Sequence, residues 1–153
     1  AIIGASLAFL AYYKHYQAEK DPKRILGSFS TAPEIRAPGW NMGTEAIGTF
    51  VLVFVVLYLS DGSMMIAGEE TPIGLGSVGA IPVGLLVFGI GIGLGGPTGY
   101  AINPARDLGP RITHAFLPIK NKGGNDWAYA WVPVIGPLIG AIAAAILFAI
   151  VGS

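Results

Sequence analysis

Polar and charged side chains gather in one short segment of an otherwise apolar chain, residues 96–111. This segment reads Gly-Pro-Thr-Gly-Tyr-Ala-Ile-Asn-Pro-Ala-Arg-Asp-Leu-Gly-Pro-Arg. It holds the amide of Asn103 and the charges of Arg106, Asp107 and Arg111. A charge between apolar stretches is costly unless it is paired or faces water, and such charges usually mark the path of a solute or ion. We therefore expect the function to lie in this segment.

A short helix is predicted to start within it. Asn103 suits the N-cap, because its side-chain oxygen can accept a backbone N–H, and Pro104 suits the first helical position. The helix is expected to continue to about Phe116. About 12 residues rise only about 18 Å, which is too short for a hydrocarbon core of about 30 Å. The pattern therefore predicts a re-entrant loop and half-helix over residues 95–116.

The backbone before this half-helix is predicted to line a water-filled cavity. Non-helical backbone is tolerated at membrane depth only where protein buries it or where water reaches it. Residues 95–103 would present free carbonyls, and the start of the helix would present unpaired amide donors with a partial positive charge. Such a lining favours neutral polar molecules and disfavours cations.

Composition places the chain among membrane proteins. Of its 153 residues, 53% are hydrophobic and 12% are charged, against about 25% charged in soluble domains. The formal net charge is zero, so nothing indicates a nucleic-acid partner. Cysteine is absent, and the sequence offers no pairing of a nucleophile with a base and no cluster of metal ligands. We therefore expect no enzyme activity, no metal site and no cofactor.

Two other patterns have ordinary structural explanations. The glycines from Gly91 to Gly96 fit the spacing of a dinucleotide-binding loop, but no strand precedes them and no acidic residue follows at the required distance. Glycines that pack helices are the favoured interpretation. His15 and His114 lie near the predicted membrane edges without a second ligand at metal spacing, which indicates interfacial histidines.

The apolar stretches predict an all-α membrane protein with a single membrane domain, 1–153. Gly136 and Gly140 have the small-xxx-small spacing by which helices pack in lipid, and we expect them to form lipid-facing patches. The expected segments are the end of a spanning helix (1–15), a loop (16–40), spanning helices (41–60, 78–94 and 131–151) and the re-entrant segment (95–116).

Residues 99–111 resemble the second Asn-Pro-Ala loop of the aquaporin superfamily, the major intrinsic proteins, and Asp107 and Arg111 resemble its glycerol facilitator (aquaglyceroporin) branch. Residues 44–49 and 132–137 resemble the helices that open and close the family's second repeat, and 27–31 resemble an external loop of glycerol facilitators. This resemblance implies the second repeat of an aquaporin-like fold, a right-handed bundle of spanning helices whose N-terminal half is missing from the chain.

The resemblance also implies solute-binding roles for four residues. Asn103 matches the pore asparagine, whose amide donates to a permeating oxygen. Arg106 matches the arginine of the selectivity filter, which donates to hydroxyls and repels cations and protons. Tyr100 falls at a filter position that is usually Phe in glycerol facilitators, and Gly91 stands where water channels usually carry histidine. Together these residues imply a pore that is wide and partly apolar, as a polyol requires.

Four other residues are expected to support the pore loop. Asp107 and Arg111 are four residues apart, so they can pair on one helix face and brace the loop. Pro104 starts the half-helix. Glu45 lies in an apolar stretch, where it could relay protons or accept hydrogen bonds from the loop amides, and the second role is favoured.

The leading functional hypothesis is a passive channel for glycerol and similar small neutral polyols, and for water, that excludes ions and protons. One alternative is a channel of the same family that conducts mainly water. Another is a secondary transporter with broken helices, which the half-helix alone would allow. A third is a structural membrane protein. The resemblance implies a homotetramer in the plasma membrane, with several spans per chain in the lipid bilayer.

Overall fold

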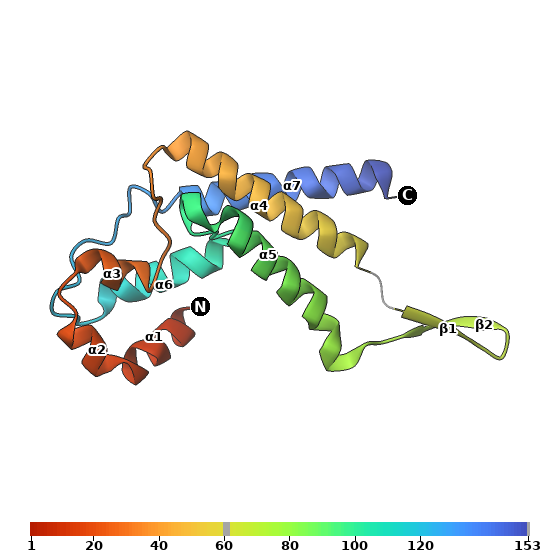
Figure 1. Ribbon diagram of the computed structural model, residues 1–153, viewed down its shortest axis with the longest axis horizontal. Coiled ribbons are helices and arrows are strands. Elements are labelled where there is room, and N and C mark those ends of the chain that lie inside the picture. Colours follow the sequence, from red (N-terminus) through yellow and green to blue (C-terminus); the bar gives the residue numbers. More distant parts are fainter. Residues whose placement is uncertain (60–61, 153) are drawn as a thin grey trace.

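The computed structural model describes residues 1–59 and 62–152, and most of them are helical (Figure 1). Three helices in this part of the chain are long and apolar enough to cross a membrane. They are α4 (Pro38–Tyr58), α5 (Ile81–Thr98) and α7 (Val132–Val151). Large apolar side chains such as Leu85 on α5 and Ile142 and Ile146 on α7 are exposed, as in helices that face lipid or another protein.

The N-terminal part folds into three short helices. These are α1 (Ile2–Ala11), α2 (Tyr13–Ala18) and α3 (Pro22–Gly27), so part of the predicted loop 16–40 is helical. Asp21 caps α3 by accepting the Lys23 N–H at 2.8 Å, and Pro22 starts the helix. Phe9, Ile25, Phe29 and Ile119 form a small apolar core between these helices and the chain that follows α6.

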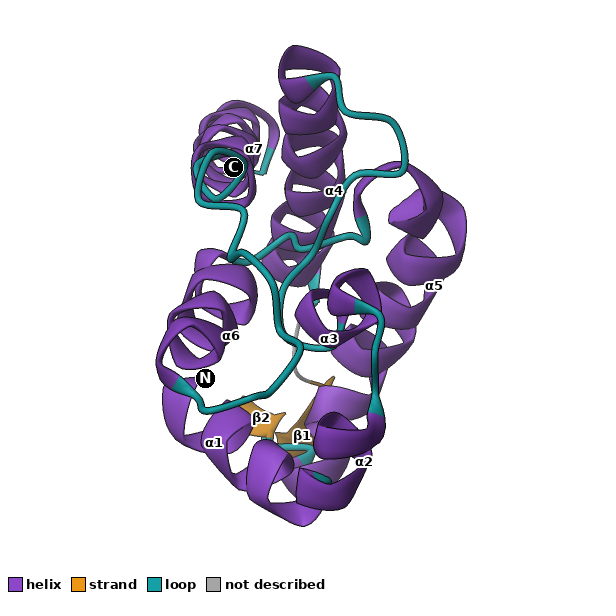
Figure 2. Cartoon of the chain, turned by 90° about the vertical axis from the view of Figure 1, so that its left-hand side faces the viewer, coloured by secondary structure: helices purple, strands orange, loops and turns teal. Residues whose placement is uncertain are grey.

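A β-hairpin connects α4 to α5, which the all-α prediction lacked. Strands β1 (Gly62–Ile66) and β2 (Glu69–Ile73) pair antiparallel, and the short helix η1 (Gly76–Ala80) follows. The turn between them has positive φ at Ala67 (55°) and Gly68 (88°), as a tight hairpin requires. Figure 1 shows the hairpin projecting from the helices at one end of the molecule. Figure 2 shows the α3–α4 and α6–α7 connections at the other end.

The predicted helix boundaries differ from the structure in a few places. The helix expected over 41–60 begins earlier, at Pro38, and residues 60 and 61 lie outside the described residues. Residues 95–98 were expected in the loop, but α5 continues through Pro97 to Thr98. Helix α6 spans Pro104–Phe116, and it ends where the sequence predicts.

Gly136 and Gly140 lie inside the molecule, and the prediction that they form lipid-facing patches was wrong. Both glycines are buried where α7 packs against α4. A Cβ built on Gly136 would lie 2.7 Å from Glu45 Cβ and 2.9 Å from the Met42 carbonyl oxygen, and one built on Gly140 would overlap the Ala46 carbonyl. The small-residue spacing therefore brings two helices of this chain together.

We expect Gly136→Ala to destabilise the full-length protein by about 1–3 kcal/mol, the usual range for overpacking a buried site. The added methyl group would be forced against the α4 backbone. The midpoint of thermal unfolding in detergent measures the effect. Gly43→Ala is the matched control, because Gly43 lies on α4 and a Cβ there would have no neighbour within 4 Å. A midpoint for Gly136→Ala that equals that of the wild type would contradict this packing.

Candidate functional site

The loop between α5 and α6 has an unusual backbone that a buried carboxylate holds in place. Gly99, Tyr100 and Ile102 have positive φ values of 75°, 39° and 42°. This left-handed backbone conformation suits Gly99 but is unfavourable for Tyr100 and Ile102, so contacts around the loop must stabilise it. The Glu45 side chain is 1% exposed and accepts hydrogen bonds from the Ala101 N–H at 3.0 Å and the Ile102 N–H at 2.6 Å. Glu45 has the geometry of a structural acceptor.

Asn103 caps α6 and keeps part of its amide free. Its Oδ1 accepts the Ala105 N–H at 2.9 Å, and Pro104 occupies the first helical position. This bond fixes which way the amide group points. The Asn103 side chain is exposed, and its Nδ2 donates to none of the described residues. A donor is therefore available at the point where the loop meets the half-helix.

Arg106 and Asp107 are adjacent on α6 but lie in opposite environments. Arg106 is exposed, and its guanidinium group makes no hydrogen bond or ion pair within residues 1–59 and 62–152. Asp107 is completely buried. The first turn of α6 thus presents one charge outward and keeps the next inside the protein.

The ring of Tyr100 lies against α5 at two glycines. A Cβ built on Gly91 would lie 3.1 Å from Tyr100 Cζ, and one built on Gly95 would lie 3.0 Å from Tyr100 Cδ1. Both distances are shorter than ordinary van der Waals contact. Gly91 and Gly95 therefore make room for the aromatic ring of Tyr100, a residue that is 39% exposed.

An open groove runs along this face of the molecule, and we call it the α5 groove. One part, of about 180 Å³, is lined by Leu52, Val87, Tyr100, Ala101, Ile102, Asn103 and Arg106. The adjoining part, of about 480 Å³, is lined by Gly84, Val87, Phe88, Gly91, Ile92 and Tyr100. The two parts share Val87 and Tyr100. The groove brings together all four of the predicted solute-binding residues, and adds apolar side chains that sequence analysis did not identify.

Arg111 forms a buried ion pair with Asp107, and both side chains are completely buried. Its Nε and Nη2 donate to the two carboxylate oxygens at 2.8 and 3.0 Å. Nη2 also donates to the Thr31 carbonyl at 2.9 Å, and Nη1 donates to the carbonyls of Asn125 and Asp126 at 2.8 and 3.1 Å. All five guanidinium N–H donors are used, which is what a buried charge needs.

A second ion pair, between Arg36 and Asp126, lies next to this network and is partly exposed. Arg36 donates to both carboxylate oxygens of Asp126 at 2.9 and 2.8 Å, and its guanidinium carbon lies 5.5 Å from the centre of the Tyr129 ring. The hydrogen bonds to Asp126 raise the pKa of Arg36, and burial raises the pKa of the Tyr129 hydroxyl. The pair therefore joins the α3–α4 and α6–α7 connections.

The two histidines lie in different environments. His15 is exposed on α2, and its place at a membrane interface stays a prediction. His114 is completely buried, so its interpretation as an interfacial histidine was wrong. Its Nδ1 lies 2.7 Å from Asn125 Oδ1, and its ring packs against Phe29 with centroids 5.3 Å apart. His114 thus helps to hold the α6–α7 connection, and no cluster of possible metal ligands occurs among the described residues.

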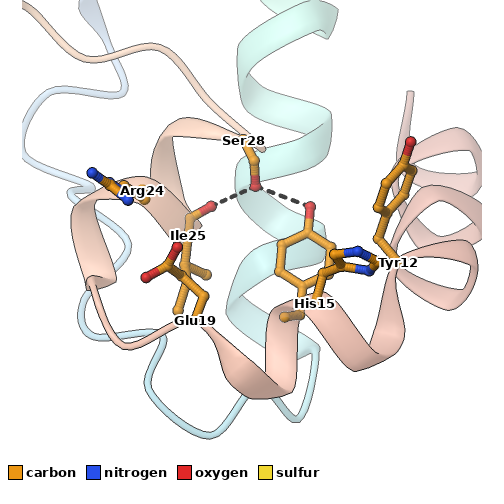
Figure 3. Close-up of a pocket in the computed structure, with 7 residues that line it drawn as sticks. Tyr12, His15, Glu19, Arg24, Ile25 and Ser28 are labelled. Carbon is orange, nitrogen blue, oxygen red and sulfur yellow. Dashed lines mark hydrogen bonds between the residues drawn. The ribbon is translucent and has the colours of Figure 1, made fainter.

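A separate hollow of about 190 Å³ lies away from the α5 groove, between α2 and α3 (Figure 3). In it, the Tyr16 hydroxyl lies 2.9 Å from Ser28 Oγ, which donates to the Ile25 carbonyl at 2.7 Å. These bonds tie α2 to α3. None of the predicted site residues lines this hollow; its lining consists of Tyr12, His15, Tyr16, Glu19, Arg24, Ile25 and Ser28.

This chain is similar in sequence and in structure to several known proteins. The chain is 54% identical over 147 residues to "Glycerol uptake facilitator protein 3" of Lactiplantibacillus plantarum, covering 96% of this chain and 57% of that protein. It is 47% identical over 150 residues to the "Glycerol uptake facilitator protein" of Streptococcus pneumoniae, covering 98% and 60%. The solved structure of the aquaglyceroporin from Plasmodium falciparum matches with a TM-score of 0.75 and 28% identity, covering 96% of this chain and 57% of that one.

These comparisons agree on the extent of the match. The chain spans 57–60% of the length of these relatives. The family model of the major intrinsic proteins matches residues 1–148, which is nearly the whole chain. The half-helix, the loop that Glu45 holds and the spanning helices therefore have a common explanation: the chain belongs to the major intrinsic protein family.

Proposed function

We propose that the full-length protein is a passive transmembrane channel for glycerol and similar small neutral polyols, with water as a second permeant. The observation that carries the proposal is the two-sided chemistry of the α5 groove. Asn103 and Arg106 offer donors, while Leu52, Val87 and Tyr100 offer an apolar surface. The groove is open along one side, so it supplies one wall of the proposed pore.

A polyol matches this lining because it has hydroxyls along one edge and carbon along the other. Its hydroxyl oxygens would accept from Arg106 and Asn103, while its carbon backbone would lie against Tyr100. The positive charge of Arg106 and the amino end of α6 both raise the energy of a cation in the groove. The names of the relatives, glycerol uptake facilitators and an aquaglyceroporin, support the same substrate class.

The geometry supports ion-coupled transport less well than passive diffusion. Ion-coupled transporters need charged or titratable groups at the solute path. The carboxylates of Glu45 and Asp107 are buried, accept hydrogen bonds from the protein, and do not line the groove. We therefore favour diffusion down a gradient. A homotetramer in the plasma membrane completes the proposal and rests on family resemblance.

Stopped-flow light scattering of proteoliposomes tests this function directly. The full-length protein should give glycerol flux that rises in proportion to the gradient and does not depend on a proton gradient. Flux of water without glycerol would favour the water-channel alternative. Glycerol flux that requires a proton gradient would overturn the passive channel in favour of a transporter.

Arg106→Ala should increase proton leak while glycerol flux is partly retained. Removing the charge lowers the barrier to cations, and a change of about 1.4 kcal/mol in that barrier alters the leak about tenfold. A pH-sensitive dye inside proteoliposomes measures the leak. Arg24→Ala removes an exposed arginine of α3 outside the groove, and it is the matched control. An unchanged leak in Arg106→Ala would remove Arg106 from the selectivity filter.

Gly91→His should reduce glycerol flux more than water flux. The Tyr100 ring occupies the space above Gly91, so an imidazole there would push the ring into the groove and narrow it. We expect glycerol flux to fall about tenfold or more, which corresponds to a barrier increase of about 1.4 kcal/mol. Gly89→Ala is the control on the same helix, where a Cβ would have no neighbour within 4 Å. Equal loss of both fluxes in Gly91→His would indicate misfolding instead of narrowing.

A further inference from the structure

The two large side chains of the α5 groove are carried by different parts of the backbone. Tyr100 belongs to the loop, directly after Gly99, and Arg106 belongs to α6, directly before Asp107. Neither side chain makes a polar contact that would fix its distance from the other among the described residues. A polyol that touches both needs that distance to be constant, so some other group must set it.

Thr31 forms hydrogen bonds with α6, the helix that carries Arg106. Its backbone N–H and its hydroxyl both donate to Asp107 Oδ2 at 2.7 Å. Its carbonyl accepts from Arg111 Nη2 at 2.9 Å. Thr31 is 5% exposed, so these bonds are shielded from water and hold strongly. The position of Asp107, and with it the first turn of α6, is thereby tied to Thr31.

The carbon atoms of Thr31 also pack against the loop that carries Tyr100. A Cβ built on Gly99 would lie 3.3 Å from Thr31 Cγ2 and 3.4 Å from Thr31 Cβ. The backbone of Gly99 therefore lies directly against this side chain. The neighbouring Glu34 N–H donates to the Pro97 carbonyl at 3.2 Å, which fixes the α3–α4 connection to the end of α5. Thr31 is thus held against the start of the pore loop.

We propose that Thr31 is a positioning residue that sets the separation of Tyr100 and Arg106 in the proposed pore. Its hydroxyl holds the residue that follows Arg106, and its methyl group holds the residue that precedes Tyr100. Thr31 does not line the groove and touches no solute there. The inference rests on the proposed function, because it concerns the selectivity of that same groove.

Two variants of the full-length protein separate the two contacts. Thr31→Val keeps the shape of the side chain and removes the hydroxyl, and with it one of the hydrogen bonds that hold Asp107, so Arg106 is positioned less firmly. We expect proton leak to rise about tenfold, the change associated with one hydrogen bond to a charged group. Thr31→Ser keeps the hydroxyl and removes the methyl group, which frees Tyr100. Its proton leak should stay at the wild-type value, while its ratio of glycerol to water permeability falls.

A double variant tests whether Thr31 acts through Arg106. In an Arg106→Ala background, Thr31→Val should change the leak by less than about twofold, because the group it positions is already absent. If the two substitutions instead raise the proton leak independently, so that the increase in the double variant is the product of the two single increases, the proposal is overturned. Ser30→Ala is the matched control, since Ser30 is the adjacent buried hydroxyl and donates to the Leu26 carbonyl instead. It should leave the leak and both permeabilities unchanged.

The outcomes distinguish this inference from the proposed function. A wild-type protein without glycerol flux would overturn the proposed function. A wild-type protein that conducts glycerol, with Thr31→Val and Thr31→Ser equal to it in leak and permeability ratio, would overturn only the role of Thr31. Thermal unfolding of each variant identifies misfolding. If Thr31→Val does not fold, a permeability ratio of Thr31→Ser that equals the wild-type ratio overturns the proposal.

Discussion

The structure depends on one constraint, that backbone which leaves helical geometry at membrane depth must still satisfy its amide groups. The loop before α6 meets it with the buried carboxylate of Glu45, which accepts the N–H groups of Ala101 and Ile102. Without an acceptor there, two amides would be buried unpaired beside residues in the unfavourable positive-φ region. Tyr100 and Asn103 can line the groove because Glu45 holds the backbone between them.

Close helix packing follows from the position of that carboxylate. Glu45 lies where α4 meets α7, and Gly136 leaves room for its Cβ. On the neighbouring turn of α4, a Cβ at Gly48 would lie 2.9 Å from Ile102 Cγ2, so the loop itself rests on this glycine. Glycines on α5 then accommodate Tyr100. Each of these glycines leaves room where backbone, the Ile102 or Glu45 side chain, or the Tyr100 ring comes close.

The sequence predicted the half-helix well because its signals are local. Asn103, Pro104 and the short run to Phe116 define both ends without any tertiary contact. The hairpin was missed because Ala67 is an unusual residue for positive φ and the acidic strand β2 resembles a polar loop. Thr31 was missed as a partner of Asp107 for a different reason. It lies 76 residues away, and a threonine in a connection gives no signal of the carboxylate that it contacts.

The misplacement of Gly136, Gly140 and His114 has a shared cause. The spacing of residues along a helix shows which face carries small or polar side chains. It does not show whether lipid, water or another part of the protein covers that face. The same limit separates the charges of α6. Asp107 and Arg111 use their hydrogen-bonding capacity inside the protein, whereas Arg106 leaves its donors open toward the groove. Because Asp107 and Arg111 pair with each other, the charge of Arg106 is unpaired within residues 1–59 and 62–152, and it adds to the partial positive charge at the amino end of α6. Asp107 is fully paired with Thr31 and Arg111, so it does not neutralise the neighbouring Arg106.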